Sequence, residues 1–169
     1  YKNEFISITA HELKTPMSSI LGFGNLLQDK RVSSDEAKRD GYLKIILEDS
    51  MRLKKLVDDL LDLSRLDLGT MKFFFENTAI MDVFENVKRE LSILAKPKDI
   101  SLVFESDKDV PESFVTDRYR LNQIMVNLVN NAIKFTPEPG KHIFIRASLQ
   151  DKFVLFSIRD EGIGIAKQD

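Results

Sequence analysis

The sequence contains no cysteine and only two histidines, His11 and His142. The lack of cysteine excludes disulfides and thiol chemistry and is typical of proteins from the reducing cytoplasm. With two histidines and no thiolate, a zinc site is a poor interpretation. No apolar run approaches the roughly 20 residues that cross a bilayer, and no segment resembles a signal peptide. We therefore expect a cytoplasmic location and no membrane contact within this chain, while anchoring of a full-length parent in the inner membrane is left open.

The sequence also lacks a strong excess of charge of either sign. The formal net charge is −2 at pH 7 and the isoelectric point is about 5.8. Because there is no general basic surface, nucleic acid is a poor candidate for the partner. Hydrophobic residues make up 43% of the 169 positions, which is enough to build a core in one or two domains.

Residues 5–16 place a histidine, a carboxylate and a hydroxyl in an amphipathic helical pattern. At about 100° per residue, His11 is predicted to face solvent, with Thr15 one turn along the same side and Glu12 at the border. An exposed imidazole beside a carboxylate can act as a nucleophile whose proton is taken by its neighbour. A surface histidine without function is one alternative; a zinc-protease helix is another, but it needs a second histidine where Thr15 stands. The apolar stripe consists of Phe5, Ile8, Leu13, Pro16, Ile20, Phe23 and Leu27.

The first 69 residues predict a helical hairpin. The first helix runs to about residue 28, a polar turn covers 29–34, and a second helix continues to about residue 68. Ser33 followed by Glu36 fits a capping box, and Gly69 is placed to end the second helix. Pro16 has no N–H to donate and is expected to bend the first helix.

The second helix carries a seam whose steps alternate between three and four residues, as in a coiled coil. A hairpin this long cannot bury both of its apolar stripes alone, so we predict that two copies form a four-helix bundle. The alternative is a hairpin that packs on its own second domain. The seam consists of Leu43, Ile46, Ser50, Leu53, Val57, Leu60 and Ser64.

After Gly69 the pattern changes to alternating strands and helices, which predicts an α/β domain. We expect strands at 71–76, 100–105, 114–115, 142–149 and 152–159, and helices at 80–95 and 117–134. The last two strands are expected to pair across a turn at 150–151. The predicted buried positions of the two helices are Val83, Phe84, Val87, Leu91 and Leu94, and Leu121, Ile124, Met125, Leu128 and Ile133.

The second of these helices is rich in asparagine, which is a poor helix former. Asn127, Asn131 and Lys134 are spaced four and three residues apart and therefore share one face. Two amide oxygens could ligate a hard cation such as Mg²⁺, and the ammonium group could reach a phosphate. A polar outer face without function is the alternative.

A third pattern follows the last predicted strand. Asp160 stands at the strand end, where its carboxylate could accept a hydrogen bond from an adenine amino group. Gly162 and Gly164 allow positive φ and close approach of the backbone to a ligand. A tight turn is the alternative interpretation of this Gly-x-Gly.

Residues 3–16, NEFISITAHELKTP, resemble the phosphoacceptor box of sensor histidine kinases. This resemblance implies that His11 receives the γ-phosphoryl group of ATP at a ring nitrogen. It also implies that Glu12 is the base or orienting carboxylate. Thr15 would position water when the same helix assists dephosphorylation of the partner.

Residues 122–137, NQIMVNLVNNAIKFTP, closely resemble the asparagine box of the ATP-binding domain of the same family, whose fold is shared with Hsp90, gyrase and MutL. By position, Asn131 is implied to be the principal Mg²⁺ ligand with Asn127 beside it. Lys134 would face the phosphates and Phe135 would lie near the nucleotide. The segment with Asp160, Gly162 and Gly164 resembles the first glycine-rich box.

The resemblance implies an α plus α/β protein: a dimerising phosphotransfer hairpin at 1–69 and an ATP-binding domain at 70–169. Because the family continues with a lid and a second glycine-rich box, we expect the second domain to be an incomplete two-layer α/β sandwich. Mg·ATP would phosphorylate His11, and the phosphoryl group would pass to an aspartate of a response-regulator receiver domain. Alternatives are a non-catalytic dimerisation and phosphotransfer module with a degenerate or incomplete nucleotide domain, and an ATPase of the Hsp90 and gyrase group without phosphohistidine.

Overall fold

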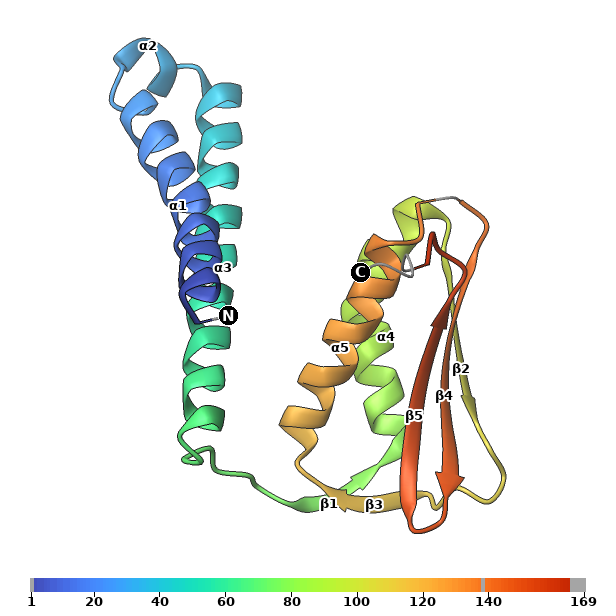
Figure 1. The fold of residues 1–169 in the computed structure, drawn as a ribbon. Helices are drawn as coiled ribbons and strands as arrows, with labels where there is room; N and C mark the ends of the chain where they lie inside the picture. Colours follow the sequence, from blue (N-terminus) through green and yellow to red (C-terminus); the bar gives the residue numbers. More distant parts are fainter. Residues whose placement is uncertain (1, 138, 165–169) are drawn as a thin grey trace. The chain divides into compact units, whose positions relative to one another are not determined.

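The computed structural model describes residues 2–137 and 139–164, and the side chains of residues 2–7 and of Ser33 lie outside the description. The chain divides into two compact units, Tyr1–Lys72 and Phe73–Asp169, which are described separately (Figure 1). Among the described residues, none of the helices combines the length and the apolarity that a membrane span requires.

The first unit is a helical hairpin, as predicted. Helix α1 (Lys2–Leu26) and helix α3 (Glu36–Asp67) lie side by side and are joined through the short helix α2 (Lys30–Ser33). The expected capping box at Ser33 is wrong, because Ser33 belongs to α2. Asp35 is the N-cap of α3, and its carboxylate accepts a hydrogen bond from the Lys38 N–H at 3.2 Å.

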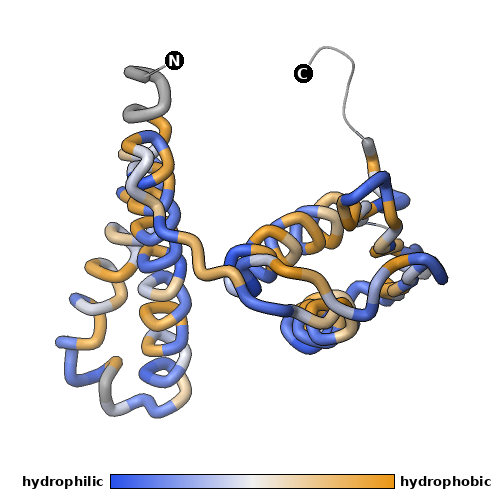
Figure 2. Tube along the Cα trace, turned by 90° about the horizontal axis from the view of Figure 1, so that it is seen from below, coloured by the Kyte–Doolittle hydropathy of each residue, from blue (hydrophilic) through white to orange (hydrophobic). Residues whose placement is uncertain are grey.

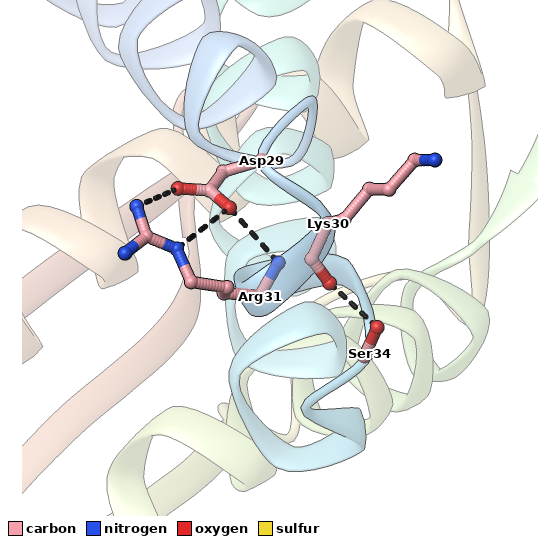
Figure 3. Close-up of polar contacts among 4 residues, drawn as sticks. All are labelled: Asp29, Lys30, Arg31 and Ser34. Atoms are coloured by element: carbon pink, nitrogen blue, oxygen red, sulfur yellow. Dashed lines mark hydrogen bonds and ion pairs between the residues drawn. The ribbon is translucent and has the colours of Figure 1, made fainter.

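The tip of the hairpin is held by short-range polar contacts (Figure 3). The Asp29 carboxylate caps α2 by accepting from the backbone N–H of Arg31 at 2.9 Å and also binds the Arg31 guanidinium. These bonds, the side-chain bond first, lower the pKa of Asp29. The Ser34 hydroxyl donates to the Lys30 carbonyl. The turn expected at 29–34 is therefore a capped helical turn.

Helix α3 ends at Asp67 with Leu68 as its C-cap, and Gly69 closes it, as the sequence predicts. Gly69 has φ +64°, and its N–H donates to the Leu66 carbonyl while the Thr70 N–H donates to the Arg65 carbonyl. This pair of bonds around a left-handed residue is a Schellman motif, which satisfies carbonyls that the helix end would leave free.

The apolar stripe of α1 is only partly covered within the hairpin. Pro16 is buried, and the Phe23 ring lies 5.0 Å from the Tyr42 ring of α3. Ile8, which belongs to the predicted stripe, is 58% exposed, and the Phe5 side chain lies outside the described residues. Helix α3 has no buried residue at all. The other stripe residues, Leu13, Ile20, Phe23 and Leu27, are half-buried.

The second unit contains two small sheets. Strand β1 (Glu76–Ala79) pairs antiparallel with β3 (Ser113–Thr116), and β2 (Ser101–Ser106), β4 (His142–Gln150) and β5 (Phe153–Asp160) form the second sheet in the order β2-β4-β5. Strand β4 is parallel to β2 and antiparallel to β5. The hairpin expected between the last two strands is confirmed.

The strand predicted at residues 71–76 is wrong. Strand β1 begins only at Glu76, which pairs with Thr116, the last residue of β3. Because the partner strand ends there, the preceding residues have no strand to pair with in this sheet. The side chains of Phe73, Phe74 and Phe75 are exposed.

Helix α4 (Ile80–Ala95), followed by the short helix η1 (Lys96–Lys98), and helix α5 (Arg118–Lys134) cover one face of the three-stranded sheet (Figure 1). The helices of this unit carry both apolar and polar residues (Figure 2), and the apolar faces of α4 and α5 meet the sheet in one core. The core residues of the two helices are Ile80, Val83, Phe84, Val87, Leu91 and Ala95, and Met125, Val129, Ala132 and Ile133; those of β4 are Ile143, Ile145 and Ala147. The predicted bounds of α4 are confirmed.

Three predicted core positions of these helices are wrong. Leu94, Ile124 and Leu128 are all about half exposed. The buried stripe of α5 instead passes through Met125, Val129 and Ala132, at spacings of four and three residues. The apolar positions of α5 exceed what one face can bury, so the pattern alone does not select the correct stripe.

Candidate functional site

His11 lies on the exposed side of α1. Thr15, one turn further on, donates its hydroxyl to the His11 carbonyl at 3.2 Å. Pro16 lies inside the helix and has no N–H to donate to the Glu12 carbonyl. One backbone hydrogen bond of the helix is therefore missing next to an exposed imidazole, and the bend expected at Pro16 stays a prediction.

Arg52 is a neighbour of this turn that the sequence did not reveal. Its guanidinium, on α3, lies 3.1 Å from the Glu12 carboxylate. Both side chains are about half exposed, so the pair contributes only about 0–1 kcal/mol to stability. The ion pair matters for geometry instead. It directs the carboxylate of Glu12, the residue after His11, toward helix α3.

An apolar cavity of about 210 Å³ lies between α1 and α3 beside this turn. The cavity is lined mainly by apolar residues, and two carboxylate residues, Glu12 and Asp59, also line it. The remaining lining residues are Ile8, Thr9, Leu13, Leu56, Leu60 and Leu63.

Helix α5 presents the asparagine face in the second unit. Asn131 and Lys134 are exposed, and Asn127 is half-buried one turn earlier. The Lys134 ammonium lies 5.2 Å from the centre of the Phe135 ring. Two amide oxygens one turn apart and an ammonium group on a common helix match the donors that a hard cation and a phosphate require. Asn127, Asn131 and Lys134 could therefore hold a magnesium phosphate group.

The end of α5 meets the glycine segment at Phe135. The Phe135 carbonyl accepts a hydrogen bond from the Ile163 N–H at 3.2 Å, and the Phe135 N–H donates to the Asn131 carbonyl at 3.0 Å. A Cβ atom on Gly162 would overlap the Phe135 carbonyl oxygen. Two segments that lie almost 30 residues apart in the chain are thus brought into contact, and the contact requires glycine at 162.

The Asp160 side chain forms a hydrogen bond within the glycine segment. Its carboxylate accepts a hydrogen bond from the Gly162 N–H at 2.9 Å and is exposed to solvent. One oxygen is engaged in the turn, and the carboxylate still has acceptor capacity for a ligand donor. Gly164 has φ +69° and no neighbouring atom within 4 Å of a Cβ position, so its role is conformational.

Glu161 is a further residue that the sequence did not reveal. Its carboxylate accepts from the backbone N–H of His142 at 2.9 Å and lies 3.5 Å from the His142 Nδ1. These contacts, chiefly the bond to the backbone N–H, lower the pKa of Glu161. The glycine segment is thereby tied to the start of β4 as well as to the end of α5.

A third set of hydrogen bonds, besides those of Ile163 and Glu161, lies at the carboxyl end of α5. Lys98, in η1, donates its ammonium to the Ile133 carbonyl at 2.8 Å, and a cation is favourable at this end of a helix. The buried hydroxyl of Thr136 donates to the Ala132 carbonyl at 2.8 Å. Helix end, glycine segment and strand start therefore form one hydrogen-bonded cluster.

Family models match both units. Residues 1–69 match the His Kinase A (phospho-acceptor) domain, and residues 116–169 match the histidine kinase-, DNA gyrase B- and HSP90-like ATPase. The sensor histidine kinase GacS of Pseudomonas protegens is 34% identical over 173 residues, which cover 99% of this chain and 18% of that protein. The chain spans about a fifth of the length of the curated relatives it matches.

Solved structures of histidine kinases share this fold. The histidine kinase AdeS of Acinetobacter baumannii has a TM-score of 0.78 at 25% identity, covering 94% of this chain and 76% of that one. Full-length ShkA, solved in complex with AMPPNP, has a TM-score of 0.69 at 25% identity, covering 98% of this chain and 35% of that one.

Replacement of Gly162 by alanine should break the junction. Because the new Cβ would overlap the Phe135 carbonyl oxygen, the segment must shift and the Ile163 bond must open. We expect a loss of about 1–3 kcal/mol in the free energy of unfolding of the second unit, measured by denaturant titration. Gly41→Ala, at a helical position with open space, is the control and should not destabilise the chain. A Gly162→Ala protein as stable as the wild type would contradict this assignment.

The lowered pKa of Glu161 predicts an acid-sensitive junction. A carboxylate whose pKa is lower in the folded state than its ordinary value of 4.5 stabilises the fold above that value, and this contribution is lost as pH falls through the folded pKa. Glu161→Gln should therefore show a shallower loss of stability than the wild type between neutral pH and about pH 3. Thermal unfolding across this range would measure it, and parallel curves for the two proteins would contradict the assignment.

Proposed function

Because this chain belongs to the sensor histidine kinases, with a phosphoacceptor domain followed by an ATPase domain, we propose that it transfers the γ-phosphoryl group of ATP to His11. The observation that carries the proposal is an exposed His11, beside Glu12, in the segment that matches the phosphoacceptor domain. ATP supplies the phosphoryl group, and this would place the reaction in the cytoplasm.

At the phosphoacceptor turn, His11 acts as the nucleophile. Its ring nitrogen forms a bond to the γ-phosphorus as the bond to the β–γ bridging oxygen breaks, and ADP leaves. Glu12 accepts the ring N–H proton or orients the ring. The contact with Arg52 supports a defined position for the Glu12 carboxylate. Thr15 would position water when the same helix assists dephosphorylation of the partner.

In the second unit, Asn131 and Asn127 would hold Mg²⁺, which neutralises phosphate charge. Lys134 would face the phosphates, and Phe135 would lie against the nucleotide. Asp160 would accept from the adenine amino group, while Gly162 and Gly164 allow the backbone to approach the ligand. The bond between Ile163 and Phe135 supports this assignment, because it brings the asparagine helix and the glycine segment together. Phosphoryl transfer depends mainly on positioning and charge, so few ionisable groups are needed.

The hairpin is proposed to act as a dimer with a second copy of this chain. Helix α3 buries none of its residues within the chain, although it carries an apolar seam. Four helices around one core would cover these side chains. The exposed apolar residues of the hairpin include Ile8, Met17, Leu21, Leu43, Leu47, Met51, Val57, Leu61, Leu63 and Leu66.

The phosphoryl group on His11 is proposed to pass to an aspartate of a response-regulator receiver domain. The carboxylate oxygen attacks phosphorus as the phosphorus–nitrogen bond breaks, and the imidazole regains its proton. An exposed histidine on a helix supports this step, because the partner must reach the phosphorylated ring.

Replacement of His11 by glutamine should abolish phosphorylation. Incubation of the wild type with Mg·[γ-³²P]ATP should give label that is stable to base and lost in acid, and His11→Gln should give none. His142→Gln is the matched control, because it removes the other histidine, and Glu161 bonds chiefly to the backbone N–H at that position. Label that persists in His11→Gln, or an unlabelled wild type, would contradict the proposed function of this chain.

Replacement of Asn131 by alanine should weaken Mg·ATP binding by about tenfold or more, because a metal ligand is lost. Calorimetric titration with a non-hydrolysable ATP analogue would measure the affinity with and without Mg²⁺. Asn77→Ala, an exposed asparagine on β1, is the control and should bind as the wild type does. Equal affinities of the Asn131 and Asn77 variants would remove Asn131 from the binding site.

A further inference from the structure

Asp117 makes two bonds with one carboxylate. Its Oδ1 accepts from the backbone N–H of Arg120 at 3.0 Å, which is the usual N-cap of helix α5. Its Oδ2 accepts from the backbone N–H of Phe74 at 2.9 Å. The second bond reaches 43 residues back along the chain, to the segment that precedes β1.

Asp117 is buried, and both of its carboxylate oxygens are hydrogen-bonded. The residue is only 7% exposed, whereas most other carboxylates of the described chain are at the surface. Hydrogen bonds from the Arg120 and Phe74 N–H groups lower the pKa of Asp117, so the carboxylate is charged at neutral pH. A charged acceptor makes each of these bonds stronger than a neutral one would be. Nearby, Arg118 contacts Asp82 of α4 at 3.4 Å, which ties the start of α5 to the neighbouring helix.

Phe74 stands where the two units are joined. The boundary between the units falls between Lys72 and Phe73, and helix α3 is closed by the Schellman motif at Gly69. Two residues after Phe74, Glu76 begins the pairing of β1 with β3. The Phe74 ring is 76% exposed, so its backbone N–H, and not its side chain, is what the second unit binds.

We propose that Asp117 is a positioning residue for phosphoryl transfer: it binds the connecting segment to the start of the asparagine helix. The segment between this bond and the bonds that close α3, in which the Thr70 and Met71 N–H groups donate to the Arg65 carbonyl, is thereby limited to residues 72–73. The catalytic part of this inference rests on the proposed function, since it concerns transfer to His11. The structural part, a segment anchored at Phe74, does not.

Anchoring the segment has a direct consequence for the reaction. When two groups are joined by a chain, their effective concentration depends on the length and stiffness of the free part. Without the Phe74 bond the free part would extend to Glu76, and the effective concentration of bound nucleotide at His11 would be lower. Because phosphoryl transfer is sensitive to small errors of position, the rate at His11 should fall while ATP affinity should not change.

Two variants remove the same bond from opposite sides. Phe74→Pro deletes the N–H donor and leaves Asp117 to cap α5, and Phe74→Ala is its control because it removes only the exposed ring. Asp117→Ser keeps an N-cap hydroxyl, which is too short to reach Phe74 as well. All variants are made in the full chain and compared with the wild type in three measurements: trypsin cleavage after Lys72, affinity for a non-hydrolysable ATP analogue with Mg²⁺, and rate of His11 labelling from [γ-³²P]ATP.

Phe74→Pro and Asp117→Ser should each be cleaved after Lys72 about tenfold faster than the wild type, since a bond to a charged acceptor is lost. Each should label His11 about three- to tenfold more slowly at saturating ATP. Nucleotide affinity should be unchanged, and the double variant should be no worse than either single one. Phe74→Ala should match the wild type.

Unchanged cleavage in both variants would overturn the anchor. Faster cleavage with unchanged labelling would show an anchor without a positioning role and would overturn the catalytic part. Weaker nucleotide binding in step with slower labelling would identify Asp117 as a residue that only stabilises α5. A wild-type chain that is not labelled would overturn the proposed function and this catalytic role together, and the cleavage rates would then still decide whether the anchor exists.

Discussion

Helix α5 is held at both ends by hydrogen bonds to groups from other parts of the chain. At its start, the Asp117 carboxylate caps the helix and binds the Phe74 N–H. At its end, the Lys98 ammonium binds the Ile133 carbonyl, and the Ile163 N–H binds the carbonyl of Phe135. With its buried stripe also packed on the sheet, the helix has little freedom to rotate or slide. The direction in which the asparagine face points follows from these constraints.

The two units solve different physical problems. The second unit has a closed core in which Val83, Val129 and Ile145 are fully buried, and this rigidity suits a site that must fix a triphosphate. The hairpin has no buried residue on α3 and keeps His11 exposed. A phosphoacceptor has to be reached by a nucleotide and then by a receiver domain, so exposure of the imidazole is a requirement of the proposed reaction. In the proposed dimer, a second copy of the chain would bury the apolar seam.

Most of the fold could be predicted from the periodicity of apolar residues, because packing on one face selects that period. The helix at 80–95 follows from this periodicity, whereas the hairpin of the last two strands also depends on the turn at 150–151 and the end of α3 on Gly69. The phenylalanine-rich segment 71–76 failed, since strand formation depends on a partner strand, and β3 ends opposite Glu76. Ile124 and Leu128 failed because α5 has more apolar residues than one face can bury.

The motifs predict which side chains touch ligands in the proposed reaction, but not the contacts that place these side chains. Arg52 binds Glu12 across 40 residues of sequence, and Glu161 binds the His142 backbone across 19. Such pairs have no spacing rule, because they depend on how whole elements pack. Moreover, the groups supplied by Phe74, Phe135 and Ile163 are backbone atoms, while the side chains of all three residues are exposed. A contact made by the backbone leaves no mark on the identity of the residue that makes it. In this chain, therefore, the motifs predict the residue types of the proposed site, and the hydrogen bonds that hold these residues in place are revealed only by the fold.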